Sequence, residues 1–435
     1  MFKKYRDQGK TEEIETELVY VVQQFGQPML QLLRSFYGTL TNAQLCQNEP
    51  TIKLIFENIN LLLQIFYSLN WVDLPEFFED NMNDFFGMFH GILKYSNPLV
   101  ETSSDDTEAG LLDISKSLII EIVNLYLEKY DEEFAKLLPQ FASAIWELLC
   151  KASMSVKHDR VRICLLIFFD SDLLHVPFVT QNYFGDWNNW HITTTIFIIL
   201  VCLQMVAKAL SFLTTVSKFG KQEFFNEQTI NTICEQIIVP NVTLREDDIE
   251  MFEDEPIEYI RRDIEGSDSD TRRRAASELI RGLCTHYEAQ VSAIFVRKIG
   301  ELLNQSSTTQ NWQSLDVAIF LVTALSVKGQ TRGKGATQIN PLVPVQDFLM
   351  SHILPQLSSQ DINSVPIVKA DSLKFICVFR QHLSKEMFHK FFPLVINMLR
   401  SNIRVVHTYA AWCTEKMLNV KDVTDQRRVV SRYTK

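Results

Sequence analysis

The sequence predicts an all-α protein. Glycine and proline number only 14 and 13 among 435 residues, which is too few for the many turns of an all-β protein. Apolar residues recur at helical spacing along most of the chain, as at Ile55, Ile59 and Leu62. Both observations favour a fold made of many helices joined by short connections.

The helices are expected to come in pairs. A long helix, a short turn and a proline-led helix recur at Pro75, Pro139 and Pro393. Helix pairs that repeat about every 40 to 47 residues are typical of HEAT-type repeats. Because no single helix here can bury its apolar face alone, stacked pairs must supply the core. The predicted fold is therefore a HEAT-repeat α-solenoid, a superhelical array of antiparallel helix pairs.

Four parts follow one another along the chain. Residues 1–159 and 205–422 carry the helical repeats, whereas 160–204 is an apolar insertion and 423–435 is a basic tail without the apolar pattern. The expected core includes a row of phenylalanines, because aromatic residues at helical spacing usually pack inside. The row consists of Phe77, Phe78, Phe85, Phe86 and Phe89.

Three stretches are expected to interrupt the helical pattern. We expect Pro28 to begin a new helical segment, since proline is favoured at the first helical position. The acidic stretch 246–255 is expected to be a loop. The stretch 329–338, rich in glycine and threonine, is expected to be a flexible loop.

The apolar insertion allows a membrane alternative. Residues 187–207 contain no Asp, Glu, Lys or Arg and are long enough to span a bilayer. Polar residues such as Asn188, Asn189 and His191 make this a borderline membrane helix. A transmembrane segment and a buried or foreign insertion both remain open from this pattern alone.

Composition narrows the classes of function. Hydrophobic residues make up 46%, charged residues 22%, and the net charge is −11, as in a globular protein with an acidic surface. Such a surface argues against nucleic-acid binding, which needs a basic footprint, and suits a partner with a basic surface. The eight cysteines are scattered, so neither a zinc site nor a disulfide framework is expected, and a reduced compartment is favoured.

No motif points to catalysis. The chain lacks a glycine-rich phosphate loop, a His-Glu-x-x-His pair and a Gly-x-Ser-x-Gly elbow. Its nine histidines are scattered. We therefore expect no enzyme, no cofactor and no metal site.

The stretch 252–284 has the clearest local pattern. Asp254 or Glu255 can cap a helix that begins at Pro256. One face of that helix is expected to be apolar, with Ile257, Ile260 and Ile264. Ion pairs four residues apart are expected from Glu258 to Arg262 and from Arg261 to Glu265, before Gly266 ends the helix.

A second helix is expected to start near Asp270 or Thr271, with an apolar face from Ala275 to Leu283. Its first turn contains Arg272, Arg273 and Arg274, although the helix dipole disfavours cations at this end. They form either a solvated face neutralised by Asp268 and Asp270, or an arginine ladder that pairs with another segment or a partner.

The same stretch resembles one family. Residues 252–266 read Phe-Glu-Asp-Glu-Pro-Ile-Glu-Tyr-Ile-Arg-Arg-Asp-Ile-Glu-Gly and continue to an Arg-Arg-Arg-Ala-Ala run. This is similar to the central region of the CAS/CSE exportins, nuclear export receptors of the karyopherin superfamily. The resemblance covers most of 1–159 and 205–421. Further matching stretches are 62–82, 108–112, 129–134, 144–146, 311–312, 369–380 and 405–411.

The resemblance implies a binding scaffold that shuttles between nucleus and cytoplasm. It implies importin-α and Ran-GTP as partners, together with nuclear pore proteins. The family's N-terminal Ran-gripping domain has no counterpart here, and 160–204 looks like a retained intron or a mispredicted exon. The residues expected to contact partners or to hold the spiral are Asp254, Glu258, Arg261, Arg262, Asp263, Glu265, Asp268, Asp270, Arg272, Arg273 and Arg274.

Two other functions compete with this one. A membrane-anchored helical protein would use 187–207, and a generic HEAT scaffold would bind partners without Ran.

Overall fold

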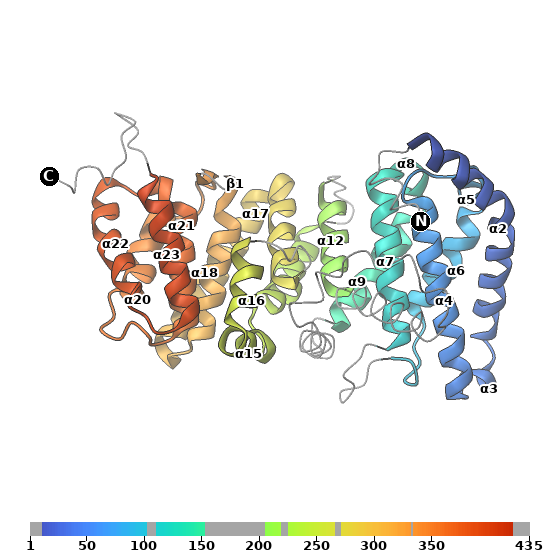
Figure 1. The fold of residues 1–435 in the computed structure, drawn as a ribbon, viewed down its shortest axis with the longest axis horizontal. Coiled ribbons are helices and arrows are strands. Elements are labelled where there is room, and N and C mark those ends of the chain that lie inside the picture. Colours follow the sequence, from blue (N-terminus) through green and yellow to red (C-terminus); the bar gives the residue numbers. More distant parts are fainter. Residues whose placement is uncertain are drawn as a thin grey trace, which may run out of the picture. The chain divides into compact units, whose positions relative to one another are not determined.

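A computed structural model of the chain describes residues 11–101, 110–152, 205–218, 225–265, 271–331 and 334–420 (Figure 1). The chain forms two compact units, Met1–Thr215 and Val216–Lys435. Each is a stack of α-helices, which confirms the predicted all-α class. The alternative membrane segment 187–207 lies outside the described residues except for 205–207, which begin a helix. The boundaries of the insertion and the tail also fall largely outside them.

The first unit consists of helices in two layers. In one layer α2 packs beside α6 and α6 beside α9, while in the other α4 packs against α7. The layers are joined by the contacts of α2 with α4 and of α6 with α7. The elements are α2 (Thr11–Thr39), α3 (Ala43–Cys46), α4 (Glu49–Asn70), α5 (Glu76–Asp80), α6 (Met82–Lys94), α7 (Leu111–Lys129), α8 (Asp131–Phe134), α9 (Leu138–Ala152) and α12 (Met205–Lys218), the last of which runs into the second unit.

Aromatic side chains fill the core between these layers. The rings of Phe66 and Phe89 meet edge to face with centroids 5.1 Å apart, a favoured geometry for aromatic pairs. All members of the predicted phenylalanine row are buried except Phe77, which is half-buried. The Tyr126 hydroxyl donates to Asn70 Oδ1 over 2.9 Å, and burial raises the pKa of this tyrosine.

Two helices of this unit, α4 and α2, differ from what their sequences alone would suggest. Among the described helices, α4 is long and apolar enough to cross a membrane. Its Ile52, Ile55 and Phe56 are buried against the rest of the unit. Pro28, predicted to begin a helix, instead lies inside α2. Because residues on both sides of this proline are buried, tertiary packing outweighs its local cost of about 3 kcal/mol.

The second unit continues the stacking of helices. Helix α17 packs against α18, α18 against α21, and α21 and α22 against α23. Its elements are α13 (Glu227–Thr232), α14 (Val239–Val242), α15 (Glu246–Asp254), α16 (Pro256–Ile260), α17 (Arg272–Thr309), α18 (Trp312–Ser326), β1 (Val327–Thr331), β2 (Gly335–Ile339), α19 (Val345–Phe348), α20 (Leu354–Leu357), α21 (Pro366–Phe379), α22 (Lys385–Met398) and α23 (Arg404–Leu418). Turns of π-helix follow α13, α16 and α19 at Ile233–Ile238, Arg261–Glu265 and Leu349–Ile353.

The prediction of a flexible loop at 329–338 is wrong, because β1 and β2 form an antiparallel hairpin there. Packing fixes this hairpin. Ala336 is fully buried, and its carbonyl lies 3.0 Å from His382 Nε2. Gly335 has φ +77°, and a Cβ at this position would lie 2.4 Å from the Val378 carbonyl oxygen. Only glycine fits such a site.

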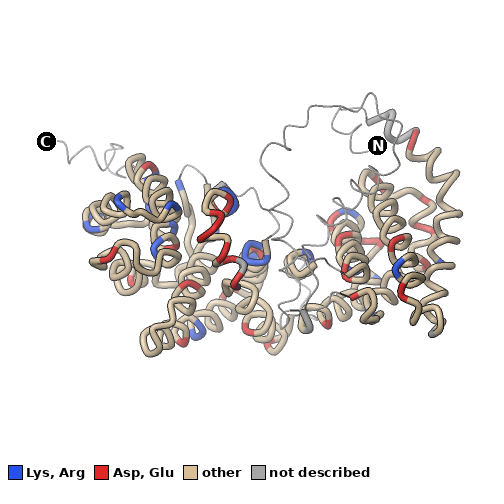
Figure 2. The backbone as a smooth tube through the Cα atoms, turned by 60° about the horizontal axis from the view of Figure 1, so that its bottom comes forward, with Lys and Arg blue, Asp and Glu red and all other residues tan. Residues whose placement is uncertain are grey.

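The prediction of an acidic loop at 246–255 is also wrong. Residues 246–254 form α15, whose acidic residues are coloured red along the tube in Figure 2. Acidic residues are favourable near a helix N-terminus, and the Arg245 N–H donates to Asp248 Oδ2 over 3.0 Å. The buried Phe252 holds the helix on the unit and meets Tyr259 edge to face.

Candidate protein-interaction site

Residues 246–265, which we call the strap, carry most of the described residues predicted as contacts. The strap consists of α15, α16 and the π-helical turn Arg261–Glu265. Pro256 begins α16 as predicted. Ile257 does not join an apolar inner face but is 60% exposed, and no residue of α16 is fully buried. The wider π turn changes the spacing on which the prediction of one buried face depended.

An ion pair stiffens the strap. Glu258 Oε1 accepts from Arg262 Nε over 2.8 Å, which is the predicted pair four residues apart. The Arg262 Nη1 lies 3.5 Å from Met251 Sδ, so this guanidinium also ties the π-helical turn back onto α15. The pair of Arg261 with Glu265 stays a prediction, because the Glu265 side chain lies outside the described residues.

Asp263 fastens the strap to two distant helices. Its carboxylate accepts hydrogen bonds from Lys374 Nζ on α21 and from the Tyr409 hydroxyl on α23. Burial by itself raises the pKa of Asp263, but the Lys374 charge and these hydrogen bonds outweigh it and leave the pKa lowered. The carboxylate is therefore the stable form of Asp263 in the folded protein.

A buried ion pair lies beside this anchor. Arg273 Nη2 donates to both carboxylate oxygens of Asp316, over 3.0 and 3.1 Å. The guanidinium also lies over the Phe320 ring, 4.5 Å from its centroid. Burial lowers the pKa of Arg273, but Asp316 and Asp371 outweigh that effect and the pKa is raised. Arg273 stays charged because carboxyl groups surround it.

Asp371 gives this cluster a second carboxyl group. Burial and the charge of Asp316 raise the pKa of Asp371 well above its ordinary value. Two adjacent buried carboxyl groups cannot both ionise at low cost. The raised pKa of Asp371 favours its protonated form, while Arg273 pairs with Asp316.

The other two arginines of the predicted ladder point elsewhere. Arg272 is buried and donates from Nη2 to Asp248 over 2.8 Å and from Nη1 to the Asn241 carbonyl over 3.2 Å. It thereby binds the C-terminal end of α14, where the dipole favours a cation. Arg274 is exposed, and its backbone N–H donates to Oγ1 of Thr271, the N-cap.

The described residues of the predicted site thus fall into two groups, one paired inside the unit and one exposed to solvent. Arg272 and Arg273 pair with other segments of their own unit, whereas Asp254 and Arg261 are exposed on the strap. Asp268 and Asp270 lie outside the described residues, as does Gly266. Whether any of these residues touches a partner stays a prediction.

The other half of the cluster comes from residues that the sequence pattern did not predict. Asp316, Asp371, Lys374 and Tyr409 come from three helices that follow the strap in the chain. One signal was available, because Asp316 is the only charged residue in the apolar helix 312–326. A charge in such a helix needs a buried partner.

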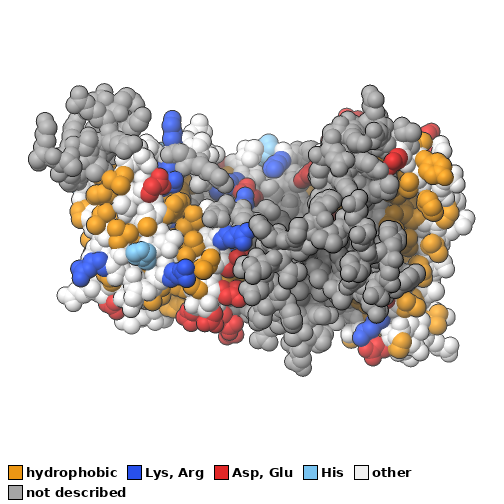
Figure 3. Space-filling model, viewed as in Figure 1, with side chains coloured by type: hydrophobic (Ala, Val, Ile, Leu, Met, Phe, Trp, Pro, Cys, Tyr) orange, Lys and Arg blue, Asp and Glu red, His pale blue; other side chains and the backbone are white. Residues whose placement is uncertain are grey.

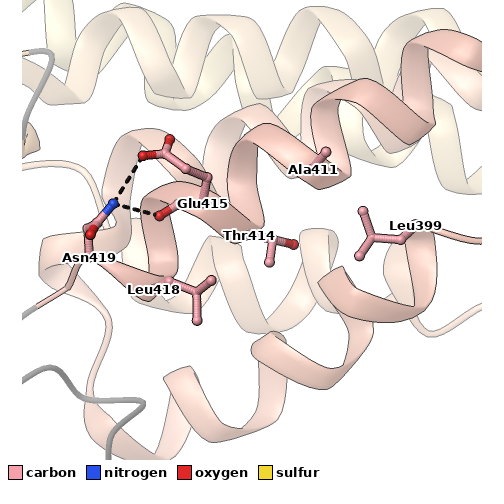
Figure 4. A pocket seen from close by; sticks show the side chains of 6 residues that line it. All are labelled: Leu399, Ala411, Thr414, Glu415, Leu418 and Asn419. Carbon is pink, nitrogen blue, oxygen red and sulfur yellow. Dashed lines mark hydrogen bonds between the residues drawn. The ribbon is translucent and has the colours of Figure 1, made fainter.

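A shallow pocket opens on the last two helices of the second unit. Its volume is about 400 Å³, and Figure 4 shows Glu415 and Asn419 bonded to one another at one side of it. This pair satisfies the polar groups and leaves a mainly apolar hollow. The lining residues are Leu399, Ala411, Thr414, Glu415, Leu418 and Asn419.

The described residues offer little for metal or redox chemistry. No group of three His, Cys, Asp or Glu among them is placed to hold a metal ion. Their cysteines are all free, and burial raises the pKa of the Cys284 thiol to about 12. Such a thiol is a poor nucleophile.

Stacked helix pairs, fastened by a buried ionic cluster and carrying an exposed acidic strap, define a HEAT-repeat protein of the solenoid class. The particular family follows from comparison with known proteins. The Cse1 family profile matches residues 1–176 and 188–414, and the chain belongs to this family. The matched ranges enter the 160–204 segment from both sides, so the limits of an insertion without counterpart stay a prediction.

Relatives and a solved structure agree with this assignment. Exportin-2 of Oreochromis niloticus is 38% identical over 429 residues, and Exportin-2 of Homo sapiens is 38% identical over 426. Each match covers 97% of this chain but 39% of the relative. A structure of the exportin Cse1 in its cargo-free, cytoplasmic state superposes with a TM-score of 0.77 at 35% identity, covering 93% of this chain and 40% of that one.

Proposed function

We propose that this chain acts as a nuclear export receptor that binds importin-α together with Ran-GTP and shuttles between nucleus and cytoplasm. The observation that carries the proposal is the similarity to Exportin-2, at 38% identity over 97% of the chain. The chain spans about two fifths of the length of those relatives. The role is that of a binding scaffold, which docks on nuclear pore proteins and catalyses no reaction.

The exposed edge of the strap is the proposed contact surface. Glu253 and Asp254 are exposed there, next to the exposed apolar side chain of Ile257. An apolar group beside acidic charges suits a basic partner, because the charges guide encounter and the buried apolar contact slows dissociation. Importin-α and Ran are the partners that the family suggests.

The arginines act indirectly in this proposal. Arg272 holds the start of the strap through Asp248, and Arg273 holds α17 on α18 through Asp316. Both keep the strap in position rather than contacting cargo. Their loss should weaken binding by destabilising the unit, whereas loss of the exposed acids should weaken binding in a fully folded chain.

Pull-down with purified importin-α and Ran tests the proposal. The wild-type chain should retain importin-α when Ran carries a non-hydrolysable GTP analogue and not when it carries GDP. The double variant Glu253→Lys with Asp254→Lys should bind about tenfold more weakly, which corresponds to about 1.4 kcal/mol.

A matched control has the same change of charge elsewhere in the second unit. Asp347 and Glu386 are exposed acids remote in sequence from the strap, so Asp347→Lys with Glu386→Lys should bind like wild type. If the chain retains importin-α equally well with either nucleotide on Ran, a generic scaffold would be favoured over an export receptor. Equal weakening by both double variants would mean that only net charge matters, and would remove the strap from the contact surface.

A further inference from the structure

The last turn of the strap is held by two helices from further along the chain. Lys374 Nζ on α21 donates to Asp263 Oδ1, and the Tyr409 hydroxyl on α23 donates to Oδ2. Each oxygen of the carboxylate therefore has its own donor, and hydrogen bonds to an ionised group are about twice as strong as neutral ones. We call Lys374 and Tyr409 the seat, because together they fix both the position and the orientation of the Asp263 carboxylate.

The seat is rigid on one side and accessible on the other. Tyr409 is 1% exposed, and its ring meets Trp412 edge to face with centroids 6.3 Å apart. Packing therefore sets the direction of the Tyr409 hydroxyl. The side chains of Lys374 and Asp263 are 32% and 31% exposed, so a small solute can reach the place where the carboxylate lies.

The surface proposed to contact partners lies between two ties. This contact edge, residues 253–257, follows Asp248 and precedes Asp263 in the strap. Arg272 holds Asp248 over 2.8 Å, and Figure 3 shows acidic side chains gathered at the surface where Figure 1 places α15. No residue of α16 is fully buried, so apolar packing contributes little to holding this helix. The position of α16 therefore depends on the tie at Asp263.

We propose that Lys374 and Tyr409 form a carboxylate-binding seat that positions the contact edge, so that both residues govern partner binding without touching the partner. They are positioning residues, since both donors are directed at Asp263. The seat recognises a carboxylate, and Asp263 fills it because the strap keeps that group close by. The part that concerns partners rests on the proposed export function, whereas docking of the strap is a property of the free chain.

Hydrogen exchange of the free chain tests the docking step. The amides of residues 251–260 should exchange about tenfold faster in Lys374→Met and in Tyr409→Phe than in wild type, because the strap loses one donor and can leave without the rest of the unit. Tyr409→Phe keeps the buried ring, so the packing of α23 on α21 is preserved. Lys298→Met is the matched control, since it breaks an exposed pair with Glu301 and should leave exchange of the strap unchanged.

Rescue by a free carboxylate separates recognition from general stability. Asp263→Ala removes the carboxylate and should speed exchange of the strap as the two donor variants do. Sodium acetate should restore slow exchange in Asp263→Ala, because acetate supplies the missing group, whereas sodium chloride at the same ionic strength should not. Lys374→Met and Tyr409→Phe should gain nothing from acetate, since they keep the carboxylate and lack a donor. Faster exchange in all three variants with no effect of acetate overturns the carboxylate-binding seat.

Pull-down then tests the positioning step. With Ran carrying a non-hydrolysable GTP analogue, retention of importin-α should fall about tenfold in Lys374→Met and Tyr409→Phe, and acetate should restore it in Asp263→Ala. Unchanged retention by a chain whose strap exchanges faster overturns the positioning role, and unchanged exchange in both donor variants overturns the seat. A wild-type chain that retains no importin-α contradicts the proposed function, and hydrogen exchange alone then decides the seat.

Discussion

The buried pair of Arg273 and Asp316 should be the most sensitive point of the second unit. The substitution Arg273→Met keeps most of the side-chain volume but removes the guanidinium that contacts both oxygens of Asp316. The Asp316 side chain has 0% exposure, so water cannot replace the lost partner. Breaking a buried ion pair on one side costs about 3–5 kcal/mol, a large part of the roughly 5–15 kcal/mol typical of a domain.

Removal of both charges should be far less harmful. In Arg273→Met with Asp316→Leu no buried charge is left alone, and such apolar replacements are often neutral or stabilising by about 1–4 kcal/mol. The loss of Asp316 also removes the negative charge that faces Asp371. Arg297→Met is the control, because its pair with Glu235 at 2.6 Å is exposed on both sides and should change stability by at most about 1 kcal/mol.

Native-state hydrogen exchange of α17 and α18 measures these differences within the second unit, since each amide reports its own opening free energy. The loss of protection should be largest for Arg273→Met and small for both the double variant and Arg297→Met. An Arg273→Met variant as well protected as the Arg297→Met control, or a double variant as unstable as Arg273→Met alone, would contradict a stabilising role for the buried pair.

Two other predictions concern the same unit. Because the pKa of Asp371 is raised in the folded protein, its protonation contributes stability that is lost as pH rises above its ordinary value of 3.8. In urea unfolding, the free energy of unfolding of Asp371→Asn should therefore rise relative to that of wild type between about pH 5 and about pH 8. A difference between the two that does not change with pH would contradict a protonated Asp371. Gly335→Ala should lower stability by at least about 1–3 kcal/mol, from left-handed strain and the clash with Val378, and a thermal midpoint equal to that of wild type would contradict it.

Local chemistry was enough to predict much of the fold. The apolar face from Ala275 to Leu283 is buried, and Thr271 caps α17. These features depend on residues within one or two helical turns of each other, so spacing determines them. The same holds for Pro256 at the start of α16.

The errors came from contacts made at a distance. Pro28 lies inside a helix because residues on either side of it pack on α4 and α6, which spacing alone does not specify. The hairpin at 327–339 depends on Val378 and His382, and the strap on Lys374 and Tyr409. No pattern within 252–284 identifies partners that lie more than a hundred residues further along the chain.

The anchor at Asp263 has a consequence for how the protein folds. In a repeat array each element touches only its neighbours, so the array can lose structure from one end without the rest. Asp263 instead bonds to residues 111 and 146 positions away. Closing so long a loop slows folding, but once closed it makes α16, α21 and α23 dependent on one another. The second unit should therefore unfold as a single cooperative block, and its last helix should not fray independently.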